Sequence, residues 1–213
     1  MKVTVLFAIA LLTVSTSIYA EDNNPNTVDE AKVIDDGAAE VMPPERLRYL
    51  LGGGFTFGGD KLATVSYTDG STDSINAGGM IEIHAGFDYR MNDDISILGT
   101  AGYHFDITKP ASNGKLTFSR FPLEMMAYLH TSDDFRIGGG TRIVLRPKLE
   151  GEGVASGLSR SFNNTFGLVV EGEYMVVPAL GIKVRYVREK YNANGLSGSI
   201  NGSHIGVLAN IYL

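Results

Sequence analysis

Acidic and imidazole side chains lie two residues apart on the polar face of two alternating segments of the chain. Glu82 and His84 alternate with mainly apolar residues in segment 79–91, and His104 and Asp106 do the same in segment 95–106. Carboxylates and imidazoles on neighbouring strands are ligands that could hold a metal ion. Histidines on a polar face more often belong to hydrogen-bond networks. We therefore expect neither a metal nor another cofactor.

Acids and bases also face one another across the tight turns that the sequence suggests. Turns near Asp93, Asp133 and Pro178 each bring an acidic residue opposite a basic or imidazole side chain on the returning segment. Directly opposed residues of antiparallel strands lie in contact, and such pairs would neutralise charge where an unpaired charge is costly. The predicted pairs are Glu82 with His104, Glu124 with Arg142, and Glu173 with Arg185.

A larger set of charged and imidazole residues shares one face of successive segments. Charges mixed with glycine suit the inside of a narrow barrel, because glycine leaves space for long arginine and glutamate side chains. We predict an inward network of structural role, made of Glu82, His84, Asp88, Arg90, His104, Asp106, Arg120, Glu124, Arg136, Arg142, Arg146, Glu171, Glu173, Lys183 and Arg185.

The elements that position these residues have a period of two, which is the signal of strands with one apolar face. Eight such segments are present, at about 48–58, 78–91, 95–107, 115–130, 135–149, 162–176, 182–192 and 198–213. Short turns alternate with longer loops, such as 59–77 and 150–161. Long strands in even number, joined in this way, predict an all-β fold: an eight-stranded antiparallel up-and-down transmembrane β-barrel.

A soluble barrel of the lipocalin type is the alternative, with apolar residues inside and charges outside. Aromatic placement favours the membrane barrel, because aromatic residues of the apolar face form one group toward the short turns and one toward the loops, as two bilayer interfaces select. The first group is Tyr49, Phe87, Tyr89, Phe135 and Tyr174; the second is Phe55, Phe57, Tyr103, Phe105, Phe121 and Phe166.

The beginning of the chain predicts export. Lys2 precedes an apolar run and a stretch of small residues ending at Ala20, the pattern of a cleaved signal peptide over 1–20. Residues 21–46 hold eight acids and two bases and predict a flexible acidic tail. This tail accounts for the net charge of −6, since 47–213, the predicted barrel, is nearly balanced. Nucleic acid is therefore not an expected partner, and the absence of cysteine excludes disulfides and thiol catalysis.

Taken together, the signal peptide, the strand count, the loop alternation and the final strand resemble the small eight-stranded outer-membrane barrels of Gram-negative bacteria, the superfamily of the OmpA membrane domain and the OmpX-like proteins. The final strand, apolar at every second position up to Leu213, resembles the assembly signal of that superfamily. Its usual terminal aromatic residue is replaced by Leu213. The resemblance implies a monomer in the outer membrane, with outer-membrane lipid, lipopolysaccharide and the barrel assembly machinery as partners.

Three functions compete for such a barrel. Some outer-membrane barrels modify lipids with a Ser–His pair that faces the membrane, and His130 and Ser132 have a suggestive spacing. Both fall at a short turn on the periplasmic side, where this geometry is wrong for nucleophilic catalysis. A narrow ion-permeable channel is disfavoured by a lumen filled with paired side chains. We therefore expect a non-enzymatic protein with a structural or surface-interaction role, because binding usually resides in loops on a rigid barrel.

Overall fold

The computed structural model describes residues 46–66, 70–108, 114–193 and 198–213. The expected signal peptide over 1–20 and all of the expected acidic tail except Arg46 lie outside the described residues. Within the described ranges, no helix is long and apolar enough to cross a membrane. The one short helical turn there is the 3-10 helix η1, Ser156–Leu158.

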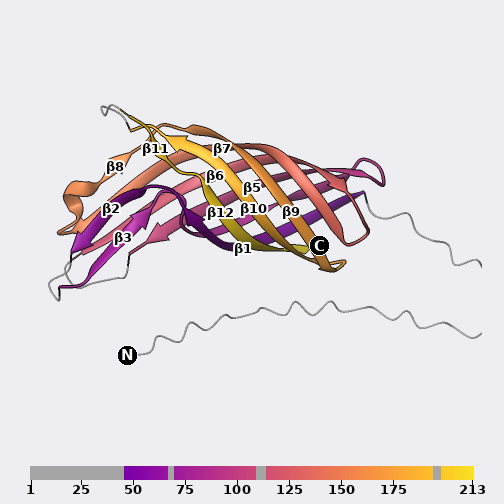
Figure 1. The fold of residues 1–213 in the computed structure, drawn as a ribbon, viewed down its shortest axis with the longest axis horizontal. Helices are drawn as coiled ribbons and strands as arrows, with labels where there is room; N and C mark the ends of the chain where they lie inside the picture. The colour runs from indigo at the N-terminus through magenta and orange to yellow at the C-terminus, as the bar shows by residue number, and fades with distance from the viewer. Residues whose placement is uncertain (1–45, 67–69, 109–113, 194–197) are drawn as a thin grey trace, which may run out of the picture. The chain divides into compact units, whose positions relative to one another are not determined.

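Eight long antiparallel strands close into a barrel (Figure 1). They are β1 (Leu47–Gly58), β4 (Met80–Arg90), β5 (Ile95–Ile107), β6 (Gly114–His130), β7 (Phe135–Gly153), β9 (Thr165–Val177), β10 (Leu180–Tyr191) and β12 (His204–Tyr212). Each strand pairs with its neighbour in the chain order, and β1 pairs with both β4 and β12, which closes the ring. The predicted fold class is confirmed.

Alternation along each strand separates an apolar outside from a polar inside. On β4, Ile83 and Phe87 are exposed, whereas Glu82 and Asp88 are buried. The same division recurs around the barrel, where large hydrophobic side chains such as Phe57 stand on the outer wall. An exterior of this kind requires a hydrocarbon surrounding, because water would penalise so large an apolar surface. The arrangement excludes the lipocalin-type alternative.

Two short strands form a hairpin where the sequence predicted an open loop. Strands β2 (Lys61–Ser66) and β3 (Thr72–Asn76) pair with each other at the end of the barrel opposite the short turns. Val65 and Ile75 are buried on one side of this hairpin. The prediction missed the hairpin because its strands are too short to show more than one or two periods of alternation. Two further pieces, β8 (Arg160–Ser161) and β11 (Ile200–Asn201), extend the barrel edge at the same end.

A β-bulge on β7 overturns the prediction for Arg146. Ser119 pairs with Lys148, but Phe121 pairs with Leu145, so β7 carries one residue more than β6 between these points. Arg146 has a φ of 50°. The extra residue inverts the alternation. Arg146 is therefore exposed instead of lying in the lumen, and Lys148 beyond it is exposed as well.

Candidate functional site

The middle of the lumen holds two arginines and two glutamates in a closed ring of ion pairs. Arg142 contacts Glu82 at 3.0 Å and Glu124 at 2.7 Å. Arg185 contacts the second oxygens of the same two carboxylates, at 2.8 Å and 2.6 Å. None of the four residues is more than 7 % exposed. Each charge has two opposite partners, which allows ionised groups to remain in a dehydrated interior.

This ring connects strands that are not neighbours in the wall. Glu124 on β6 and Arg142 on β7 are paired across a ladder, as predicted. Glu82 comes from β4 and reaches Arg142 across the lumen. The ladder partner of Glu82 is His104, which confirms that predicted pair as well. The ring therefore braces opposite walls of the barrel as well as neighbouring strands.

Two more glutamates extend the ring. Glu171 lies 3.2 Å from Nε of Arg185 and accepts hydrogen bonds from Lys183, at 3.4 Å, and from the hydroxyl of Tyr128. Glu189 lies 3.2 Å from Nε of Arg142. Glu189 also accepts a hydrogen bond from the hydroxyl of Tyr191. The alternation of charges alone did not predict these tyrosine contacts.

The third predicted pair, Glu173 with Arg185, is wrong by two residues. The ladder between β9 and β10 sets Arg185 opposite Glu171 and Lys183 opposite Glu173. The turn itself comprises only Pro178 and Ala179. A bulge on β9 lies next to the turn, because Leu180 pairs with Val177 but Gly181 pairs with Met175. The short turn and the bulge together move the register by two residues. Opposite charges still face each other, because Arg185 pairs with Glu171 and Lys183 with Glu173.

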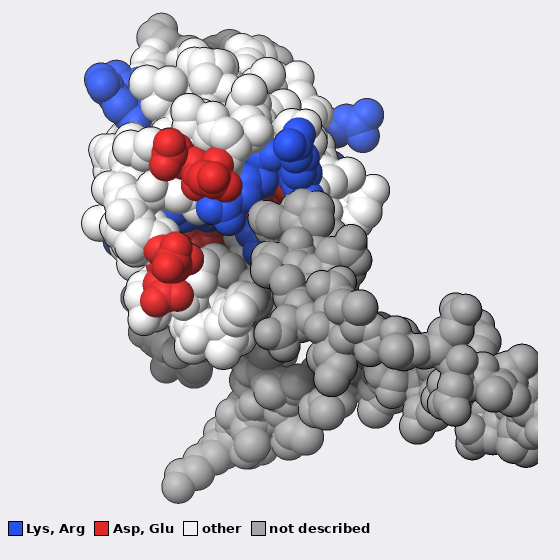
Figure 2. Space-filling view, turned by 90° about the vertical axis from the view of Figure 1, so that its right-hand side faces the viewer, with Lys and Arg blue, Asp and Glu red and all other residues white. Residues whose placement is uncertain are grey.

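A second ionic group closes the lumen at the end with the short turns. Arg136 contacts Asp88 at 2.8 Å and Glu173 at 2.7 Å, and Arg48 contacts Asp88 at 2.9 Å. The Tyr212 hydroxyl donates to Glu173 at 2.7 Å. Figure 2 looks onto this end and shows Lys and Arg side chains gathered near its centre beside acidic ones. Arg90 stands at the rim, partly exposed, and donates to the backbone of the neighbouring turn.

Histidines and one more arginine lie between the ionic ring and the loop end. Both ring nitrogens of His104 are near guanidinium groups, at 2.9 Å from Arg120 and 3.0 Å from Arg142. His84 lies elsewhere in the lumen, with Nε2 2.8 Å from the Asn210 side-chain oxygen. Asp106 accepts a hydrogen bond from the backbone of Asn76 at 3.0 Å. This last contact ties the wall to the base of the β2–β3 hairpin.

Glu82, His104 and His204 have ligand atoms within 4.8 Å of one another, which is compatible with a metal site. This differs from the set that the sequence brought together. His84 has its Nδ1 4.0 Å from Glu82 but its Nε2 at Asn210, and Asp106 contacts Asn76. Arg120 and Arg142 contact His104 and Glu82 in the same volume. Two guanidinium charges would repel a cation from this position. We assign no metal here.

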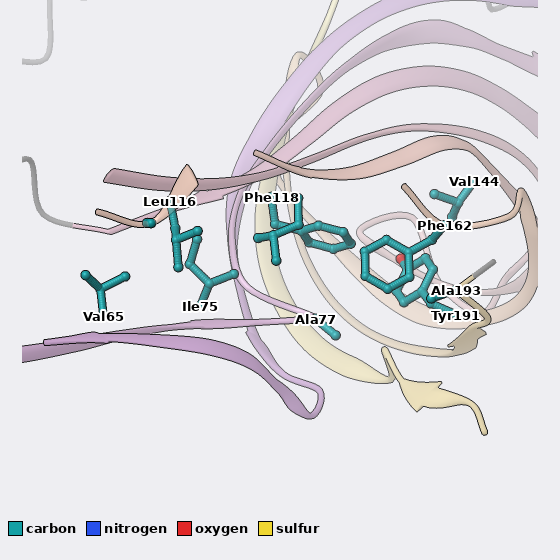
Figure 3. Close-up of a cluster of buried hydrophobic side chains, with 11 residues drawn as sticks. Val65, Ile75, Ala77, Leu116, Phe118, Val144, Phe162, Tyr191 and Ala193 are labelled. Carbon is teal, nitrogen blue, oxygen red and sulfur yellow. The ribbon is translucent and has the colours of Figure 1, made fainter. Parts of the chain in front are cut away.

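An apolar cluster fills the loop end of the lumen (Figure 3). The ring of Phe118 meets those of Phe162 and Tyr191 edge-on, at 5.7 and 5.6 Å between centroids. Val65 and Ile75 of the β2–β3 hairpin belong to the same cluster. The sequence did not lead us to predict this cluster. Phe118 has the same parity as the inward residues Arg120 and Glu124 of its segment, and this parity was the available signal.

The suggested pairing of His130 with Ser132 does not occur. Ser132 Oγ accepts a hydrogen bond from the backbone N–H of Phe135, at 3.1 Å, within the turn. His130 Nε2 instead lies 3.0 Å from Oγ of Ser96. Ser96 is 1 % exposed and also receives a hydrogen bond from Arg136. A substrate cannot reach the Ser96 hydroxyl, so Ser96 and His130 do not form an accessible nucleophile–base pair.

Gly138 shows how tightly the network is packed. A Cβ at this position would lie 2.7 Å from the ring of Tyr128, whose hydroxyl bonds to Glu171 and whose face lies 4.1 Å from Arg136. We expect Gly138→Ala to lower the free energy of unfolding by about 1–3 kcal/mol, because the tyrosine must move. The matched control is Gly139→Ala, where a Cβ would meet only a backbone oxygen at 3.9 Å. Urea titrations of both refolded variants check this; equal stabilities would contradict the packing described.

Comparison with known proteins supports the fold. No protein-family model matches the chain, and no curated protein matches its sequence. Crystal structures of Ail, the attachment invasion locus protein of Yersinia pestis, one in complex with the heparin analogue sucrose octasulfate, give a TM-score of 0.51 at 11 % identity, covering 78 % of this chain and 96 % of Ail. Neisserial surface protein A gives 0.45 at 14 % identity, with coverages of 78 % and 96 %. The chain has the fold of small eight-stranded outer-membrane β-barrels.

Proposed function

We propose that this protein is a closed barrel of the Gram-negative outer membrane that conducts no ions and presents its loop end to the outside of the cell. The observation that carries the proposal is the occupied lumen. Paired charges fill it from the short-turn end to the ring of Arg142 and Arg185, and the cluster around Phe118 fills the loop end. Eight strands enclose an interior just wide enough for side chains.

The surface role rests on what the loop end displays. Strand β7 extends to Gly153, and its far end carries η1 and β8. The base of the β2–β3 hairpin is tied to β11, since the backbone N–H of Asn201 donates to Asp60 at 2.8 Å. Elements held this firmly on a barrel can present a defined surface to a partner. Ail, with the same fold, is an attachment protein crystallised with a heparin analogue, which supports attachment as the kind of role.

The remaining parts of the proposal follow from this location. Residues 1–20 direct export, 21–46 form a periplasmic tail, and 47–213 insert as a monomer through the barrel assembly machinery. Outer-membrane lipid and lipopolysaccharide surround the apolar wall. A lipid-modifying activity is not proposed, because the serine that contacts a histidine in the described residues, Ser96, is buried at the short-turn end.

Cysteine labelling tests the location and orientation, because the native chain has no cysteine. Ser66→Cys places a thiol on the exposed face of the hairpin, and Asp133→Cys places one in a short turn at the other end. We expect a polymer-linked maleimide to label Ser66→Cys on intact cells and to label Asp133→Cys only after the outer membrane is permeabilised. The labelled protein should fractionate with the outer membrane. Equal labelling of both thiols on intact cells would overturn the proposal.

A further inference from the structure

A groove on the outer wall lies between β9 and β10, near their loop ends. It has a volume of about 330 Å³ and is lined by Phe166, Gly167, Leu168, Arg188, Glu189 and Lys190. Phe166 and Leu168 are outward and exposed. Arg188 and Lys190 are exposed beside them. The Glu189 side chain points the other way, into the lumen, where it meets Arg142. The groove therefore combines an apolar floor with two cations and no outward acid of its own.

The groove lies where the apolar wall ends. On β10 the outward residues are apolar through Val184 and Tyr186 and then become basic at Arg188 and Lys190. The ladder places Arg188 opposite Leu168, so β9 is still apolar at that level. In a barrel whose loops face outward, this transition marks the depth of the outer-leaflet headgroups.

Neither cation forms an ion pair with the part of the chain that the structure describes. Among the described residues, no carboxylate lies within 4.0 Å of the side-chain nitrogens of Arg188 or Lys190, whereas the lumen arginines Arg136, Arg142 and Arg185 each have such partners. Their charge is therefore available to an anion. A guanidinium binds two phosphate oxygens at once, and an ammonium adds a point charge beside it.

We propose that this groove is a binding site for a phosphorylated lipid of the outer leaflet. Arg188 and Lys190 contact the phosphate, and one acyl chain lies along Phe166 and Leu168. A free phosphate would contact only the two cations, and a neutral lipid would contact only the apolar floor. A phosphorylated lipid would contact both. The inference rests on the proposed outward orientation of the loop end.

Native mass spectrometry of the refolded full-length barrel in detergent tests the site, with diphosphorylated lipid A and its dephosphorylated form as probes. The variant R188Q/K190Q removes both cations. The control K61Q/R160Q removes two equally basic, exposed residues from the hairpin and from β8, away from the groove. We expect the first variant to bind diphosphorylated lipid A about tenfold more weakly than the wild type, through loss of charge-assisted contacts. The control should bind as the wild type does.

Three results would overturn the site: equal binding by both variants, equal binding of dephosphorylated lipid A, or displacement of the lipid by millimolar inorganic phosphate, which would indicate a soluble anion instead. Heat-modifiable gel migration confirms that each variant is folded. The lipid-binding and labelling experiments test the two proposals separately. Correct labelling without lipid A binding would reject this site alone, and lipid A binding with reversed labelling would reject the proposed orientation.

Discussion

Arg142→Met is expected to lower the free energy of unfolding by about 3–5 kcal/mol, the range for removing one partner of a buried ion pair. The guanidinium is fully buried and contacts Glu82, Glu124 and Glu189 within 3.2 Å. Its loss leaves carboxylates facing one another with less compensation in a medium of low dielectric constant. A urea titration in lipid vesicles, followed by the gel shift between folded and unfolded barrel, measures the difference.

Two further variants test whether the loss of stability in Arg142→Met comes from the unpaired buried charge. Lys148→Met removes a cation whose pair with Glu150 is half exposed, and it should cost no more than about 1 kcal/mol. Adding Glu124→Gln alone to Arg142→Met should recover part of the lost stability, because one carboxylate is then neutralised for the one guanidinium removed and Glu82 still pairs with Arg185. If Arg142→Met were as mild as Lys148→Met, the ring would not stabilise the barrel as described.

Phe118→Ala is expected to lower the free energy of unfolding by about 3–5 kcal/mol, through lost burial and the cavity left behind. Phe118 is fully buried between Phe162 and Tyr191, and the hairpin residues around it cannot all move inward. The same urea titration measures it. Phe166→Ala is the control of equal size, because Phe166 is 61 % exposed on the outer wall. Lipid chains can fill the space there, so its loss should be smaller. Equal losses would argue against a packed loop end.

Alternation along single strands predicted much of this molecule, because a period of two fixes which side chains share a face. The strand positions and the pairs of Glu82 with His104 and of Glu124 with Arg142 are confirmed by the ladders. The same rule fails wherever a bulge inserts a residue. It placed Arg146 inside, where the structure has it outside, and it set Glu173 two residues away from its partner, Lys183.

Contacts across the lumen could not be predicted in this way. Glu82 meets Arg142 and Arg185 from strands that are not its neighbours, and this depends on the closure and width of the barrel. Tyr128 and Asn210 are uncharged. Charge complementarity therefore could not indicate which residues they would contact. The apolar cluster was missed for a related reason. Parity shows that Phe118 is inward, whereas the hairpin that covers it is apparent only in three dimensions.

The central claim is that the lumen is closed, and single-channel recording tests it most directly. The purified barrel should be reconstituted in a planar bilayer, with its folded state confirmed by heat-modifiable migration. The paired charges around Arg142 and the cluster around Phe118 predict a silent bilayer, without stepwise current at moderate voltage. Stable, reproducible conductance steps that scale with salt concentration would contradict the closed lumen.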